Sequence, residues 1–169
     1  MKQAVFILGP ESSGTRMLTQ AFIHLGFYGD AGHKQRLDAQ PFSETPNKIV
    51  FRRSLPHGKT FPKVAASCLA MLDAGYAVTP VLIVRDKDIT AESQVRNGWV
   101  ASIERAYEQI RHSVDHVYLE LAEVKLFPVV LHYEPFVLHA QVRELFFAEF
   151  DLDVPQMEFV DGNAKYRKG

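Results

Sequence analysis

A short loop near the start of the chain carries the residues best suited to chemistry. Residues 7–18 read ILGPESSGTRML: an apolar run ends at Gly9, and a helix-period pattern begins after Gly14. This outline is typical of loops that wrap backbone N–H groups around a phosphate. The loop of nucleoside-triphosphate enzymes has Lys and then Ser or Thr after its last Gly, whereas Thr15 and Arg16 stand here. The pattern therefore predicts an anion site that differs from a usual Mg-ATP site.

Hydroxyl groups and one guanidinium support this prediction. Ser12, Ser13 and Thr15 offer hydroxyls. The amides of Gly14 and Thr15 fall at a helix N-terminus, and Arg16 adds a positive charge. The alternative is a simple strand-to-helix turn capped by Ser13. A cap alone needs neither the glycine nor this density of hydroxyls, so we favour an anion site.

A second cationic group follows a later apolar run. In VLIVRDKDITAESQVRNGW, residues 81–99, Arg85 ends a predicted strand and Ser93 follows in the next helix. An Arg at a strand tip can bind two oxygens of an anion, and a Ser two turns later can donate to the same group. The alternative is that Arg85 pairs with Asp86 or Asp88 and that Ser93 faces water.

Apolar runs that alternate with helix-period segments predict the fold that positions these groups. The expected strands are residues 4–8, 48–52, 78–84, 116–119 and 129–132. Their continuous apolar character is typical of strands covered on both faces. We expect a three-layer α/β/α fold with a mainly parallel sheet, like that of P-loop NTPases. Ligands of such sheets bind beyond the carboxyl ends of the strands, where Gly9, Arg52 and Arg85 fall.

The expected helices lie between these strands. Their apolar positions are Met17, Leu18, Ala21, Phe22 and Leu25; Val64, Cys68, Leu69 and Leu72; Val95, Trp99, Ile103 and Ile110 within one helix over residues 91–111; and Leu138, Val142, Leu145 and Phe146. The single cysteine, Cys68, is expected to pack in the core. The polar connection over residues 29–47 is a candidate lid or acceptor-binding loop.

Composition limits the possible functions. The 169 residues fit one domain, and 19 Lys and Arg against 20 Asp and Glu exclude a general electrostatic affinity for nucleic acid or anionic membranes. The N-terminus has neither a signal-peptide nor a membrane-span pattern, so we expect a cytoplasmic protein. No His, Cys or carboxylate spacing predicts a metal site.

From Ser13 onward, PESSGTRML is similar to the first loop of the sulfotransferase superfamily, which reads roughly Pro-Lys/Arg-Ser-Gly-Thr and then Thr, Ser or Arg. These P-loop-like enzymes use 3′-phosphoadenosine-5′-phosphosulfate (PAPS), a donor without a γ-phosphate that needs no magnesium. The resemblance thus accounts for the missing loop lysine. It implies one group of residues for the 5′-phosphosulfate and one for the 3′-phosphate. They are Ser12, Ser13, Gly14, Thr15 and Arg16 in the loop, and Arg85 with Ser93 after the later strand.

The resemblance covers roughly residues 5–155. Within residues 127–155, Tyr133 and Glu134 stand at the superfamily's Tyr-Glu pair, which we interpret as orienting the donor loop. The chain ends on an Arg-Lys-Gly triplet like the one with which the superfamily closes over the 3′-phosphate: Arg167, Lys168 and Gly169.

The segment IVFRRSLPHG, residues 49–58, is similar to the superfamily's second strand and its Lys-Thr-His-Leu-Pro ending. In this register Arg52 takes the place of the Lys and Ser54 that of the catalytic His. His57, three residues later, is the expected general base.

The loop cation that contacts the leaving oxygen in the superfamily is replaced by Ser12. Sulfuryl transfer builds negative charge on that oxygen, so a cation must lie close to it. Arg16 from the same turn, and Arg52 or Arg53 from the next strand, are the expected substitutes.

The resemblance implies sulfuryl transfer from PAPS to a hydroxyl or amine of an unidentified acceptor, with no metal required. Two alternatives stay open. One is a P-loop nucleotide or small-molecule kinase, in which Asp86 or Asp88 would hold magnesium. The other is a non-catalytic nucleotide-binding module, which Ser12 and Ser54 favour because they replace a cation and a base.

Overall fold

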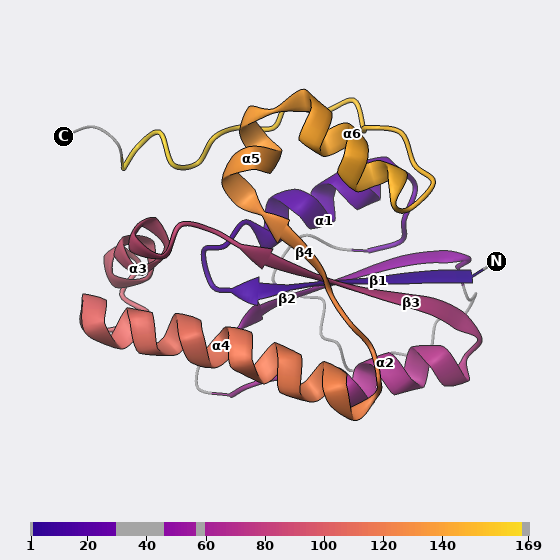
Figure 1. The fold of residues 1–169 in the computed structure, drawn as a ribbon, viewed down its shortest axis with the longest axis horizontal. Helices are drawn as coiled ribbons and strands as arrows, with labels where there is room; N and C mark the ends of the chain where they lie inside the picture. The colour runs from indigo at the N-terminus through magenta and orange to yellow at the C-terminus, as the bar shows by residue number, and fades with distance from the viewer. Residues whose placement is uncertain (1, 30–45, 57–59, 167–169) are drawn as a thin grey trace.

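Within the described residues, four parallel strands form one sheet at the centre of the molecule (Figure 1). The structure is a computed structural model, and it describes residues 2–29, 46–56 and 60–166. The strands are β1 (Lys2–Pro10), β2 (Lys48–Leu55), β3 (Tyr76–Val84) and β4 (Val129–His132), in the order β2-β1-β3-β4.

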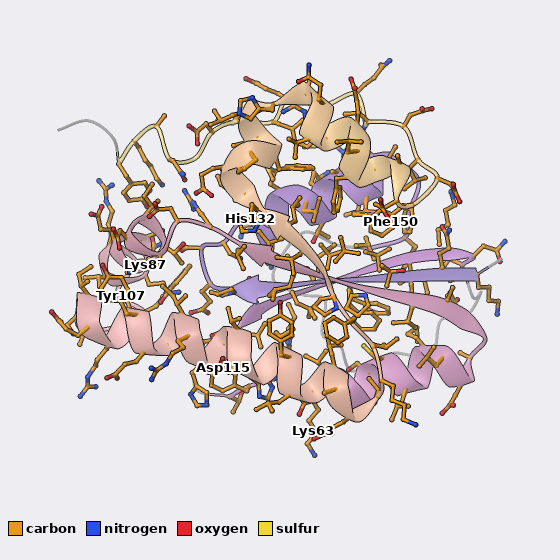
Figure 2. The ribbon with its side chains drawn as sticks, in the orientation of Figure 1. Lys63, Lys87, Tyr107, Asp115, His132 and Phe150 are labelled. Carbon is orange, nitrogen blue, oxygen red and sulfur yellow. The ribbon has the colours of Figure 1, made fainter. Side chains whose placement is uncertain are left out.

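Helices cover both faces of the sheet, which confirms the expected α/β/α architecture (Figure 1). One face carries α1 (Thr15–His24), α5 (Tyr133–Leu138) and α6 (Ala140–Ala148), and the other carries α2 (Val64–Asp73) and α4 (Ile103–Glu123). Helix α3 (Lys87–Arg96) lies near the carboxyl ends of the strands and packs on α4. Figure 2 shows Tyr107 of α4 beside Lys87 of α3, whose Nζ lies 5.6 Å from the ring centroid.

The side chains of β1 enter two separate cores because successive strand residues face opposite sides. Val5 and Ile7 pack with α1, α5 and α6, whereas Phe6 and Leu8 pack with α2 and α4. Cys68 of α2 is fully buried in the second core, as expected. Burial, with a contribution from the charge of Glu120, raises the pKa of its thiol to about 12.

Phe22 of α1 is central to the first core. It is fully buried, and its ring centroid lies 5.1 to 6.3 Å from those of Phe27, Phe146, Phe147 and Phe150. Three of these pairs are edge-to-face, an arrangement that aromatic rings prefer. The cluster joins α1 to α6 above the sheet.

The strand expected at residues 116–119 is wrong, because these residues lie within α4. The side chain of Ser102 caps the N-terminus of α4. The buried residues of α4 include Ser113, Val117 and Leu121, which are four residues apart. This helical spacing runs through the short apolar segment and outweighs its local strand preference.

The single helix expected over residues 91–111 is also wrong. Helix α3 ends before Gly98, whose φ of +71° favours glycine, and α4 begins after a short connection. The expected continuous face is therefore interrupted, and Trp99 is 51% exposed.

The last expected helix is likewise divided. Leu138 ends α5 and Val142 lies in α6, with extended backbone at His139 between them. Leu145 is exposed rather than part of the apolar face, while Phe146 is buried as expected.

Replacing Phe22 tests the first core. We expect Phe22→Ala to lower the free energy of unfolding by about 3–5 kcal/mol, because it removes the ring at the centre of the cluster. Leu145→Ala, on the exposed side of α6, is the control and should change it by less than about 0.5 kcal/mol. Urea denaturation measures both, and equal losses would contradict this account of the core.

Candidate functional site

The connections that follow β1 and β3 run in opposite directions across the sheet. The chain passes from β1 to β2 on one side and from β3 to β4 on the other. In open parallel sheets, ligands bind where the order reverses in this way, beyond the carboxyl ends of the strands. The loop after β1 and the segment from Arg85 into α3 lie at this position, as expected from the sequence.

The β1–α1 loop turns sharply through left-handed backbone at Ser12 (φ +70°) and Gly14 (φ +103°). The N–H of Ser13 donates to the carbonyl of Pro10 at 3.1 Å, which closes the turn. Two constraints require glycine at position 14. Its positive φ favours glycine, and a Cβ there would lie 2.6 Å from Cδ2 of Tyr133. Gly14 is the N-cap of α1, and among the described residues no side chain caps this helix. The simple Ser13 cap is therefore wrong.

Ser13 has an unusual hydroxyl. Its side chain is 1% exposed, and within the described part of the chain its Oγ has no hydrogen-bond partner. The hydroxyl lies against Gly9, where a Cβ would be only 2.5 Å from it. A buried hydroxyl without a partner costs about 1–3 kcal/mol. This cost is a common sign of a ligand or ion site.

A hydroxyl pair joins the loop to the end of β2. The Oγ atoms of Thr15 and Ser54 are 2.8 Å apart, and Ser54 pairs with Gly9 across the β1–β2 ladder. Ser54 stands, by the sequence resemblance, at the place of the superfamily's catalytic His. It lies beside the loop, where its hydroxyl contacts that of Thr15.

Arg85 and Ser93 both contact Ser12. Arg85 Nη1 donates to the Ser12 carbonyl at 2.6 Å, and Ser93 Oγ donates to Ser12 Oγ at 2.9 Å. Ser93 is 6% exposed, so the alternative of a Ser93 that faces water is wrong. The loop and the β3–α3 segment are thus held together at one residue.

The carboxylates beside Arg85 have partners of their own. Asp86 Oδ1 caps α3 by accepting the N–H groups of Asp88 and Ile89, and Asp88 Oδ1 accepts the hydroxyl of Tyr107 at 2.9 Å. Arg85 Nε donates instead to Asn163 Oδ1 at 2.7 Å. In the ranges that the structure describes, no group of three or more His, Cys, Asp and Glu could hold a metal ion.

Tyr133 and Glu134, at the start of α5, contact the residues around the loop. The Tyr133 ring lies against Gly14, and the guanidinium of Arg85 stacks 4.6 Å from its centroid. Glu134 Oε1 accepts a backbone N–H just after β3 at 3.0 Å and Asn163 Nδ2 at 2.8 Å. Tyr133 thus contacts the loop, whereas Glu134 contacts the segment after β3, and the role of the pair in orienting the loop stays a prediction.

Residues 160–166 fold back onto Arg85. The hydroxyl of Tyr133 accepts the N–H of Gly162 at 2.9 Å, and the side chain of Asn163 is completely buried. The ring of Tyr166 lies 6.0 Å from the Arg85 guanidinium. Burial opposes ionisation of Tyr166, but a hydrogen bond with Ser93 and nearby cations outweigh it and lower the pKa of the phenol.

Glu11 is fixed by its backbone from two sides. Its N–H donates to the carbonyl of Leu55 at 3.0 Å, and its carbonyl accepts Nε2 of Gln94 at 2.9 Å. Burial raises the pKa of its side chain to about 7. Near neutral pH this carboxyl group therefore carries only part of a negative charge.

The remaining expected site residues fall into three groups. Arg16 is exposed on the first turn of α1. Arg52 pairs with Ile7 and, by strand alternation, lies on the same face as α1, whereas Arg53 lies on the opposite face. The other expected residues lie outside the described part of the chain: His57, Arg167, Lys168 and Gly169, and residues 30–45 of the 29–47 connection.

The sequence motifs do not predict two residues of the site, Gln94 and Asn163. Gln94 and Asn163 are completely buried polar side chains that contact Glu11 and Arg85. The buried face of α3 is unusually polar, and that pattern is a signal for Gln94. The turn around Asn163 offers no comparable signal.

No protein-family model, curated protein or solved structure matches this chain. Among the described helices, none has the length and apolar character needed to cross a membrane. A function must therefore be inferred from the geometry of the site itself.

The raised pKa of Glu11 predicts a pH dependence of stability. In the unfolded chain this group titrates near pH 4.3, so the folded state binds more protons between about pH 4.3 and 7, and stability falls as pH rises through that range. Glu11→Gln stays neutral, so we expect its stability relative to wild type to rise between pH 5 and pH 8. Urea denaturation across this range measures the difference. Glu158→Gln, at an exposed position, is the control, and parallel curves for wild type and Glu11→Gln would contradict the prediction.

Proposed function

We propose that the chain binds PAPS across the β1–β3 switch point and transfers its sulfuryl group to a hydroxyl or amine of an acceptor. The proposal rests on one contact pattern. Arg85 and Ser93, to which the resemblance gives the 3′-phosphate, both contact Ser12 in the loop to which it gives the 5′-phosphosulfate. These contacts join residues 73 and 81 positions apart in the sequence. PAPS carries its two anionic groups on one ribose, at the 3′ and 5′ positions, so the residues that bind them must lie close together.

The loop side supports binding of a phosphosulfate without a metal. The N-terminus of α1, the unpartnered hydroxyl of Ser13 and the charge of Arg16 offer donors to an anion. A magnesium-dependent kinase is less well supported, because Asp86 caps α3 and Asp88 accepts a bond from Tyr107.

Sulfuryl transfer needs in-line attack, a base for the acceptor proton and a cation near the leaving oxygen. In this proposal Arg16 and Arg52 supply the cations and His57 the base. The bond between Ser54 and Thr15 favours a second candidate, a non-catalytic nucleotide-binding module, because a hydroxyl replaces the superfamily's base there. Turnover of PAPS with small hydroxyl and amine acceptors separates the two: firm binding without any sulfated product would support the module.

Metal-independent nucleotide binding is the first consequence. We expect 3′-phosphoadenosine-5′-phosphate at a hundredfold excess over its Kd to stabilise the protein by about 2.7 kcal/mol, seen as a higher Tm, even in EDTA. Thermal denaturation with and without EDTA measures this effect. ATP with magnesium is the comparison ligand, and stronger protection by it would favour the kinase.

The second consequence concerns the 3′-phosphate. We expect Arg85→Ala to weaken binding of 3′-phosphoadenosine-5′-phosphate by about 2–4 kcal/mol, because it removes a charge-assisted contact, and to leave adenosine 5′-phosphate nearly unaffected. Isothermal titration calorimetry measures both affinities. Arg111→Ala, an exposed position on α4, is the control. Equal losses for the two nucleotides would mean that Arg85 is purely structural.

A further inference from the structure

A buried amide separates two opposite charges behind the loop. Asn163 is completely buried, its Oδ1 accepts Arg85 Nε at 2.7 Å, and its Nδ2 donates to Glu134 Oε1 at 2.8 Å. A guanidinium only donates hydrogen bonds and a carboxylate only accepts them, so one orientation of the amide satisfies both neighbours. Asn163 is therefore a neutral bridge between a cation and an anion.

The position of this bridge is fixed from several sides. The N–H of Asn163 donates to Asp161 Oδ1 at 2.9 Å. Glu134 is held independently by a backbone N–H just after β3, and the Arg85 guanidinium is stacked on Tyr133. The three partners thus meet at defined places rather than through a flexible surface contact.

The bridge has an electrostatic consequence. A guanidinium and a carboxylate in direct contact form a strong, often bidentate pair, which occupies the donors of the guanidinium and offsets its charge. With the amide between them, Arg85 Nε has a neutral acceptor, and Nη1 is directed to the carbonyl of Ser12 in the loop. The charge of Arg85 is kept on the side where an anion would bind.

We propose that Asn163 is a positioning residue that orients Arg85 toward the loop and separates it from Glu134, so that Arg85 can bind the 3′-phosphate of the donor nucleotide. This inference rests on the proposed function for the identity of the ligand. Asn163 thereby contributes to ligand selectivity in addition to Arg85 and Ser93.

A charge-conserving double variant tests the separation directly. Asn163→Asp combined with Glu134→Gln keeps the net charge and reverses the roles of the two side chains: the introduced carboxylate accepts from both Arg85 and the introduced amide. The negative charge now touches the guanidinium. Because Glu134 Oε1 also accepts the backbone N–H just after β3, the introduced amide cannot keep both bonds, so we expect a folded protein with a lower Tm than wild type. We expect at least a tenfold loss of affinity for 3′-phosphoadenosine-5′-phosphate, and affinity for adenosine 5′-phosphate within about twofold of wild type.

Single variants complete the test. Glu134→Gln retains an oxygen that can accept from Asn163, and we expect it to keep the preference for the 3′-phosphorylated nucleotide. Asn163→Ala removes the bridge without adding charge and should lose the preference; it also serves if the double variant does not fold. Asn47→Asp combined with Glu158→Gln, both at exposed positions, is the matched charge-conserving control for the double variant.

The outcomes distinguish this inference from the proposed function. If wild type prefers the 3′-phosphorylated nucleotide and both Asn163 variants keep that preference, the role of Asn163 is overturned while the proposed function stands. If wild type shows no preference, the proposed function fails, and the Arg85 Nε–H resonance, titrated with inorganic phosphate, decides the inference. A shift in wild type that is lost in Asn163→Ala supports the positioning role; no shift in wild type overturns it.

Discussion

The site depends on one constraint, the sharp reversal of the backbone between β1 and α1. Left-handed conformations at Ser12 and Gly14 let the chain turn within a few residues and start a helix at the edge of the sheet. The ring of Tyr133 fills the space that a side chain at Gly14 would need. Arg85 and Ser93 then hold Ser12 from the neighbouring strand and helix. Without this turn, the contacts of α3, α5 and the C-terminal segment would have no common point.

Much of the fold follows from local sequence, and the exceptions have a physical cause. Four strands were predicted because β1 to β4 are apolar runs bounded by turn residues, and parallel pairing buries such runs on both faces. The run at residues 116–119 is just as apolar, but it lies in a capped helix whose spacing is set by residues on both sides. An apolar run of four residues is compatible with a strand or a helix, whereas the spacing of buried residues along the twenty-one residues of α4 identifies a helix.

The candidate site divides in the same way. The loop from Ser12 to Arg16 is a contiguous motif, and Arg85 with Ser93 has a spacing that a strand tip and a helix explain, so both were found in the sequence. Asn163 was not, because its role depends on contacts with residues 78 and 29 positions away. Nothing in its own turn indicates that Arg85 and Glu134 will meet there. The raised pKa of Glu11 likewise arises from burial, which its position in the loop does not disclose.

The charge of the chain shows how such a site can attract an anion. With a net charge of −1, the protein as a whole offers no long-range attraction to a phosphorylated ligand. Acidic residues also surround the loop, since Glu11 lies within it and Glu134 lies behind it. Glu11 is only partly ionised near neutral pH because it is half-buried, and the amide of Asn163 separates Glu134 from Arg85. Both features reduce the negative charge that a bound anion would meet near the loop. In the proposed function, selectivity for an anion therefore depends on side-chain positions rather than on the total number of cations.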